Sequence, residues 1–185
     1  LEEPYAQNVL TDLGFTVVPT PADLRFSGQG DALRCGNYLF TGSTYRTDNT
    51  VHAYLAKTLG LEVVSLQTIP KRRWHGFGPR VFNASSGWPD SFFYDIDLAL
   101  AVLRPPNKGQ KGLIAWCPAA FTRASRKLLR EFDEVEKIEV SRSEAIHGFA
   151  CNLVSTGQTV IMSDKAPHLQ AELENRGFTT VTPPI

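Results

Sequence analysis

One short pattern recurs along this chain and limits the folds that the chain can form. A helical segment closes on glycine and an apolar run follows at once, in DLGFTVV (12–18), TLGLEVV (58–64) and NRGFTTV (175–181). Glycine often closes a helix because it adopts the left-handed conformation that the turn requires. The repetition of one helix-to-strand step predicts an α/β architecture of similar units that pack around a shared core.

The complete repeating unit is longer than this step. We expect helices over 51–60, 122–133 and 167–177, each preceded by two apolar runs and followed by a third. We also expect a helix over 3–14 and a buried strand over 15–20, which would form the last two elements of a further unit. The runs, in chain order, are GDALRC, NYLFTG, LEVVSLQTI, IDLALAVL, GLIAWCP, VEKIEVS, ACNLVS, QTVIMSD and FTTVTP. The sequence therefore predicts three complete ββαβ units in a single domain over 1–185, with one inserted loop over 70–91 that is a lid, a binding loop or disordered.

Composition narrows the classes of function. The formal net charge is zero, whereas proteins that bind nucleic acid usually carry a basic face. The longest apolar run, 92–103, is too short to span a membrane and contains Asp95 and Asp97. We therefore expect neither nucleic acid nor a membrane as a partner.

The cysteines and histidines do not form a metal or disulfide pattern. An odd number of cysteines without CxxC spacing favours reduced, buried thiols in a cytoplasmic protein. These are Cys35, Cys117 and Cys151. The histidines lack metal-ligand spacing, so we expect no metal and no cofactor. His52 and His168 fit surface positions, and the close pair His147 and Cys151 fits packing better than catalysis.

The stretch 25–49 has the layout of a binding site for a small charged molecule. An acidic glycine-rich turn, SGQGD (27–31), leads into a strand, and STYRT (43–47) follows just before a helix. A helix N-terminus favours anions, and arginine pairs with a carboxylate. The same residues also suit a tight turn followed by a Ser/Thr helix cap, which is the simpler interpretation. Both interpretations stay open on local sequence.

Several motifs resemble those of one enzyme superfamily. FSGQGDAL (26–33) resembles F-E-G-G/Q-G-D, GSTYRT (42–47) resembles G-x-S-x-R-T, FYDIDLALAVL (93–103) resembles a Y-H-L-D segment, and FACNLV (149–154) resembles an ACN segment. On these motifs the chain resembles the guanidine-modifying pentein, or amidinotransferase, superfamily, which includes dimethylarginine dimethylaminohydrolases and arginine deiminases. The resemblance implies an α/β propeller of five ββαβ units. About three lie here, so we expect an incomplete ring and a fragment.

The resemblance also implies roles for individual residues. Family chemistry uses a cysteine nucleophile, a histidine that moves protons and a glutamate that orients it. Ser27 occupies the glutamate position and Asp95 the histidine position, and we expect the nucleophile strand beyond residue 185. Asp97 matches the acid that holds the guanidinium, and Arg46 matches the arginine that binds the substrate carboxylate. Asp31 matches the acid of the turn, where a structural role is equally open.

Three hypotheses of function follow. The first is a chain derived from a guanidino-group hydrolase or amidinotransferase that is inactive by itself. The second is a non-catalytic pentein that binds an arginine-like molecule or a protein partner, and a homo-oligomer or a companion segment stays open for both. The third is a different enzyme that uses Asp95 and Asp97 as a carboxylate pair. Two residues apart on a strand, they would face the same side, and repulsion would raise one pKa.

Overall fold

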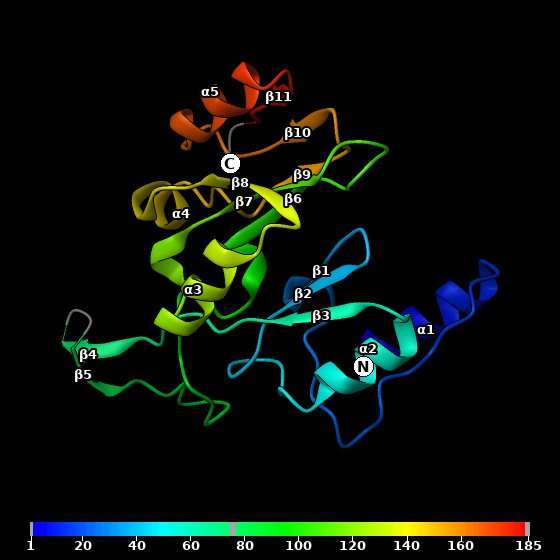
Figure 1. Cartoon of the computed structure of the whole chain (residues 1–185). Coiled ribbons are helices and arrows are strands. Elements are labelled where there is room, and N and C mark those ends of the chain that lie inside the picture. Colours follow the sequence, from blue (N-terminus) through cyan, green and yellow to red (C-terminus); the bar gives the residue numbers. More distant parts are fainter. Residues whose placement is uncertain (1, 75–76, 184–185) are drawn as a thin grey trace.

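The computed structural model describes residues 2–74 and 77–183 and contains three ββαβ units (Figure 1). In each unit the first two strands are antiparallel, and the third strand runs parallel to the second, which lies in the middle of the sheet. The helix of the unit connects the middle strand to the third. The predicted order of strands and helices within these three units is therefore confirmed.

The units have the following bounds. Unit one comprises β1 (Ala32–Cys35), β2 (Tyr38–Thr41), α2 (Val51–Leu59) and β3 (Glu62–Ser65). Unit two comprises β6 (Leu100–Arg104), β7 (Gly112–Trp116), α3 (Arg123–Glu131) and β8 (Val135–Glu139). Unit three comprises β9 (Val154–Ser155), β10 (Thr159–Ile161), α5 (Pro167–Asn175) and β11 (Thr179–Val181).

Further elements connect or flank the units. Helix α1 (Glu2–Asp12) precedes unit one, strands β4 (Arg72–Trp74) and β5 (Phe77–Arg80) form a hairpin after it, and helix α4 (Arg142–His147) joins units two and three. Short 3₁₀ turns cover Gly28–Asp31, Ile96–Leu98 and Pro118–Ala120. The predicted inserted loop thus contains an antiparallel hairpin, although His75, within that loop, lies outside the described residues. Within the described ranges, no helix is long and apolar enough to cross a membrane.

One hydrophobic core runs through units two and three and reaches into unit one. It includes Phe40 of β2, Trp116 of β7, Leu129 of α3 and Leu173 of α5, each completely buried. A smaller cluster, formed by Leu39, Val51 and Leu55, fixes α2 against its own sheet. Because α2 and α5 each contact the third strand of their own unit, the sequence repeat becomes a repeat of packing as well.

Two predictions about local structure are wrong. The apolar run 15–20 is not a buried strand: it is extended but unpaired, and Phe15 and Val18 are exposed. A strand needs a neighbour that accepts its hydrogen bonds, and the described residues provide none at this place. His52 is buried rather than exposed, because its Nε2 lies 2.9 Å from the Gly42 carbonyl oxygen inside unit one.

Candidate functional site

Three carboxylates meet where two 3₁₀ turns pack together, one just before unit one and one just before unit two, and we call Asp31, Asp95 and Asp97 the acidic cluster. Asp31 ends the first turn, Asp95 caps the second and Asp97 lies within it. The backbone N–H of Ile96 donates to Asp31 Oδ1 at 3.0 Å, which fixes one turn against the other. The glycine-rich sequence of the first turn permits this approach, because a Cβ on Gly30 would lie 2.9 Å from Asp95 Oδ2.

Arg46 provides one positive charge beside the acidic cluster. Its Nη1 lies 2.8 Å from Asp95 Oδ2, and its guanidinium carbon lies 5.3 Å from the Tyr94 ring centroid. The Asp95 side chain is 9% exposed, whereas that of Arg46 is 49% exposed. On the other side of the cluster, the Asn152 amide donates to Asp97 Oδ2 at 3.2 Å.

Two carboxylate oxygens in the cluster lack a partner. Asp31 Oδ2 and Asp95 Oδ1 are buried and accept no hydrogen bond from the described residues. A buried polar atom without a partner is unfavourable, so such atoms are uncommon unless a ligand or water completes them. With three carboxylates and one arginine, the site has an excess of hydrogen-bond acceptors over N–H donors.

Burial raises the pKa values of all three acids. Desolvation raises the pKa of Asp31 to about 6, and the nearby Asp95 charge adds to that shift. Desolvation and the Asp95 charge likewise raise the pKa of Asp97 to about 6. Desolvation also raises the pKa of Asp95, against the lowering effects of Ser27 and Arg46. The cluster therefore favours a proton or another cation.

The structure brings the predicted site residues together, but with different contacts from those expected. Asp95 and Asp97 belong to a 3₁₀ turn rather than a strand, which corrects the strand geometry of the third hypothesis. Arg46 pairs with Asp95 within the chain. Asp97 lines a cavity of about 380 Å³ together with Cys151, whereas Arg46 lines a separate one of about 290 Å³ beside Trp88.

Sequence reasoning missed the contact between Asn152 and Asp97. Asn152 belongs to the ACN motif, so the motif itself was a signal that could have pointed to this side chain. The buried hydroxyl of Thr47 was missed as well. It accepts the Ser27 backbone N–H at 3.1 Å, and the Thr47 hydroxyl lowers the pKa of Asp31.

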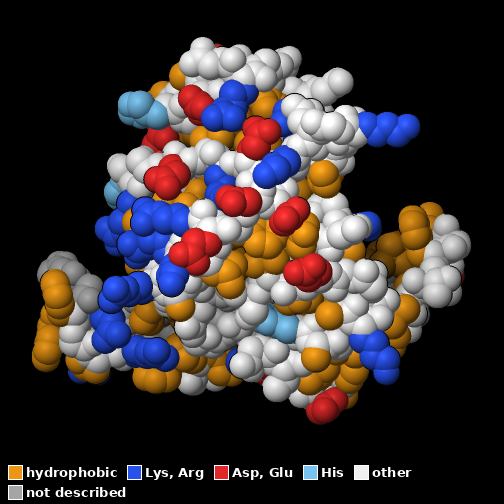
Figure 2. All heavy atoms as spheres, viewed as in Figure 1, with side chains coloured by type: hydrophobic (Ala, Val, Ile, Leu, Met, Phe, Trp, Pro, Cys, Tyr) orange, Lys and Arg blue, Asp and Glu red, His pale blue; other side chains and the backbone are white. Residues whose placement is uncertain are grey.

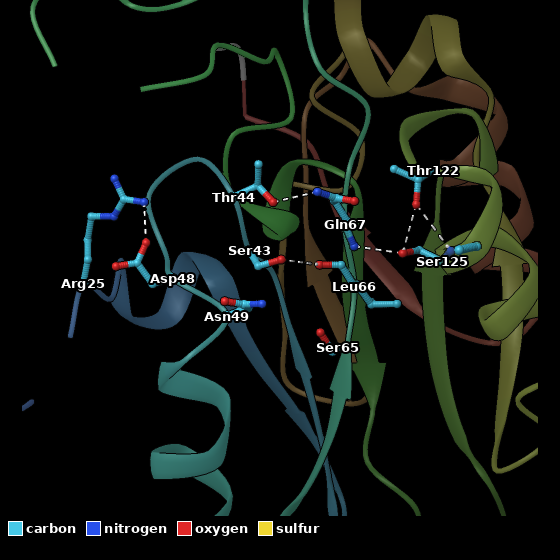
Figure 3. Close-up of a pocket in the computed structure, with 11 residues that line it drawn as sticks. Arg25, Ser43, Thr44, Asp48, Asn49, Ser65, Leu66, Gln67, Thr122 and Ser125 are labelled. Carbon is cyan, nitrogen blue, oxygen red and sulfur yellow. Dashed lines mark hydrogen bonds and ion pairs between the residues drawn. The ribbon is translucent and has the colours of Figure 1, made fainter. Parts of the chain in front are cut away.

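A larger polar pocket of about 430 Å³ lies between units one and two and does not include the acidic cluster (Figure 3). The Gln67 amide donates to Thr44 Oγ1 at 2.7 Å, and its backbone N–H donates to Ser125 Oγ at 2.9 Å. Arg25 pairs with Asp48 at 2.6 Å on the far wall. Because Gln67 bonds both Thr44 and Ser125, the pocket forms a polar joint between the end of β3 and the start of α3, although Arg25 Nε on its wall is buried without a partner among the described residues.

The cysteines of the described chain are all free and buried, as predicted. Burial raises the pKa of the Cys35 thiol to about 11 and raises the pKa values of Cys117 and Cys151 as well. Reactive cysteines are exposed and have lowered pKa values. These three thiols therefore act as packing groups.

Comparisons with known proteins identify relatives of this chain. No family model matches the chain. It is 32% identical over 187 residues to the bifunctional arginine dihydrolase/ornithine cyclodeaminase AgrE of Nostoc, which covers 100% of this chain and 23% of AgrE. It is 33% identical over 154 residues to the dimethylarginine dimethylaminohydrolase of Mycobacterium tuberculosis, which covers 83% of this chain and 42% of that protein. The chain thus spans less than half of these relatives.

Solved structures show the same relationship. The substrate-bound N-terminal domain of ArgZ, an arginine dihydrolase from cyanobacteria, matches with a TM-score of 0.76 and 31% identity, over 99% of this chain and 59% of that one. A Pseudomonas aeruginosa dimethylarginine dimethylaminohydrolase with citrulline matches in fold, with a TM-score of 0.63 at 16% identity over 99% of this chain and 58% of that one. With its ββαβ units and its homology to these arginine-modifying enzymes, the chain belongs to the pentein, or amidinotransferase, superfamily.

Proposed function

We propose that the acidic cluster binds the guanidinium group of an arginine-like molecule, in a chain derived from a guanidino-group hydrolase. The unpaired buried oxygens of Asp31 and Asp95 carry this proposal. A guanidinium offers five N–H donors in one plane and stays charged at every relevant pH, so it matches a site that lacks both donors and positive charge. In the same proposal, the three units are consecutive blades of an α/β propeller.

Arg46 has donors to spare for the other end of such a ligand. Only its Nη1 contacts Asp95 within the described residues, and half of its side chain faces solvent. Its remaining N–H groups are therefore free to meet a carboxylate. In this arrangement the ligand guanidinium lies toward Asp95 and Asp97, and the ligand carboxylate lies toward Arg46.

A titration with arginine tests this site. We expect a dissociation constant on the order of millimolar, because water screens the half-exposed arginine contact. Asp97→Asn and Arg46→Ala should each weaken binding about tenfold or more, consistent with about 1.5–3 kcal/mol for a charge-assisted contact. Calorimetry or NMR shifts measure the binding of arginine to both variants and to the wild type. Citrulline is the matched neutral ligand, and it should bind to the wild type more weakly than arginine does.

The second candidate is that Arg46 and the acidic cluster hold the two turns together without any ligand. The 2.8 Å pair between Arg46 and Asp95 favours it. In that case Asp97→Asn and Arg46→Ala would lower the melting temperature and leave any binding of arginine unchanged. That combination would exclude the binding site and retain the structural role.

We further expect this chain by itself to release no citrulline, ammonia or methylamine from arginine or methylated arginines. Ser27 and Asp95 occupy the positions that the resemblance gives to the catalytic glutamate and histidine, and Asp95 is already paired with Arg46. Colorimetric product assays on the purified chain measure this directly. Turnover that disappears in Asp97→Ala but persists in Cys151→Ser would show that the chain is an enzyme with a different nucleophile.

A further inference from the structure

The two ends of the inserted loop, 70–91, are bonded to each other and form one side of a groove. The Lys71 N–H donates to the Asp90 carbonyl at 2.8 Å, and the Lys71 ammonium pairs with the Asp90 carboxylate at 2.8 Å. Beside this pair, the Ser91 hydroxyl donates to the Ile69 carbonyl at 2.7 Å. Contacts within the chain therefore fix the shape of the loop base.

The groove has a volume of about 390 Å³ and lies between this loop base and helix α4. Its apolar walls come from Ile69 and Pro70 before the hairpin, Phe92 and Phe93 after it, and Ile146 on α4. Phe93 is 2% exposed, and its ring packs edge-on against that of Phe92 with 5.0 Å between centroids. The walls belong to the connection from unit one to unit two and to that from unit two to unit three. The groove is thus built in the middle of the described chain.

The rim of the groove is positively charged. Arg72 and Arg142 lie there, and the only carboxylate among the described lining residues, that of Asp90, is neutralised by Lys71. Arg142 is exposed and makes no hydrogen bond or ion pair with other described side chains. Arg72 uses one N–H, at Nη1, for the Gly78 carbonyl at 2.6 Å and keeps the others. Lys and Arg side chains gather on the side of the surface that carries the hairpin, α3 and α4 (Figure 2).

Apolar walls and a cationic rim together define a class of ligand. Pockets for small molecules typically have volumes of about 300–1,000 Å³ and mostly apolar walls, with a few polar groups that orient the ligand. An arginine side chain offers N–H donors that match a carboxylate. The same charge repels a guanidinium, so the groove differs in selectivity from the acidic cluster. It suits an anion with an apolar body.

We propose that this groove is a second binding site, which takes a small carboxylic acid with an aromatic or branched apolar body. The apolar body lies between Phe92 and Ile146, and the carboxylate meets Arg142 at the rim. The hydrogen bonds of the loop base already hold the binding shape, so little ordering is needed when the ligand binds. The acidic cluster takes no part in this contact.

A titration of the isotope-labelled protein with phenylacetate, followed by NMR, tests the site. We expect a dissociation constant on the order of millimolar for a probe of this size, with shifts concentrated at residues 69–72, 90–93 and 142–146. Phenylacetamide has the same body without the charge and should bind at least about threefold more weakly. Acetate has the charge without the body and should cause no shifts there. Saturating arginine should leave the phenylacetate shifts unchanged.

Two arginine variants form a matched pair for this titration. Arg142 and Arg123 are both exposed, and each opens a helix directly after a Ser or Thr cap, but of the two only Arg142 lines the groove. Arg142→Gln should weaken phenylacetate binding about threefold or more and remove the preference over phenylacetamide. Arg123→Gln should bind like the wild type. Ile146→Glu, which places a negative charge on the wall, should abolish binding while circular dichroism shows a folded protein.

Several results would overturn this second site. Phenylacetate that causes no shifts at the groove would do so, as would equal binding of phenylacetamide or an equal effect of the two arginine variants. Displacement of phenylacetate by arginine would place the probe at the acidic cluster and also reject the groove. An absence of arginine binding, by contrast, would reject the proposed function and leave the groove intact, so the two proposals fail separately.

Discussion

Gly42→Ala should lower the stability of this protein by about 3 kcal/mol, because the site has no room for one more carbon. A Cβ at this position would lie 2.0 Å from Asp31 Oδ1 and 2.6 Å from Ile96 Cγ2. The Gly42 N–H donates to the Asp31 carbonyl, and the Gly42 carbonyl contacts His52, so the backbone is held in place. Overpacking of this kind typically costs 1–3 kcal/mol. The expected fall in melting temperature is about 6–12 °C.

Urea unfolding of a double-mutant cycle identifies the clash as the cause. Asp31→Ala removes the carboxylate that the new methyl group would meet, so it should reduce the effect of Gly42→Ala by at least about 1 kcal/mol. Ser43→Ala, the matched control, changes the neighbouring residue without adding atoms and should have a small effect. Equal stability of Gly42→Ala and wild type would show that the two turns separate easily, and the cluster would then lose its rigid frame.

Asp31→Asn should have the opposite effect and stabilise the protein at pH 7.5. Burial raises the pKa of Asp31 from 3.8 to about 6, and the residue is 1% exposed. A shift of about two units corresponds to about 3 kcal/mol that the ionised form loses on folding. The amide keeps an oxygen for the Ile96 N–H and places an NH₂ group where the buried acid has an unpaired oxygen. We expect a rise of about 6–12 °C in melting temperature.

The pH dependence checks the sign of this effect. The folded protein holds the Asp31 proton more tightly than the unfolded chain, so the wild type loses stability as the pH rises from about 4 to about 6. The advantage of Asp31→Asn should therefore be largest above pH 6 and vanish near pH 4. Asp23→Asn, at an exposed acid, is the matched control and should change little. A lower melting temperature for Asp31→Asn at pH 7.5 would mean that the charge itself supports the fold.

The same variant links stability to the proposed ligand. If Asp31 is kept charged for a cation, Asp31→Asn should bind arginine more weakly while it melts at a higher temperature. Functional sites commonly trade stability for binding in this way. A variant that gains stability without losing any affinity would place Asp31 outside the ligand contact and leave Asp95 and Asp97 as the binding acids.

The sequence predicted the repeating elements well because the signals are local. Apolar runs and helical spacing specify the strands and helices of all three units without knowledge of their neighbours, and a closing glycine adds to the signal in units one and three. The prediction of a strand over 15–20 was wrong because strand formation is not a local property. An apolar run does not reveal whether a partner strand is present. Helix α4 was missed because six residues capped by Ser141 carry too little periodicity to detect.

The candidate site residues could be selected from the sequence, but their contacts could not. Motif resemblance selected Asp31, Arg46, Asp95 and Asp97, and the fold does bring them close together. The pair between Arg46 and Asp95 joins residues 49 positions apart in different units, and no local pattern encodes such a contact. The prediction that His52 is exposed was wrong for a similar reason. One polar residue in a helical pattern does not indicate which face of the helix packs against the sheet.

The three buried cysteine thiols can be used as probes of local opening in the three units. Cys35 lies in unit one, Cys117 directly follows β7 of unit two, and Cys151 lies three residues before β9 of unit three. Each sulfur meets an alkylating reagent only when the structure around it opens, and regions of one protein open with different free energies. Proteins that retain a single one of these thiols would therefore report how often each repeat opens while the others remain closed.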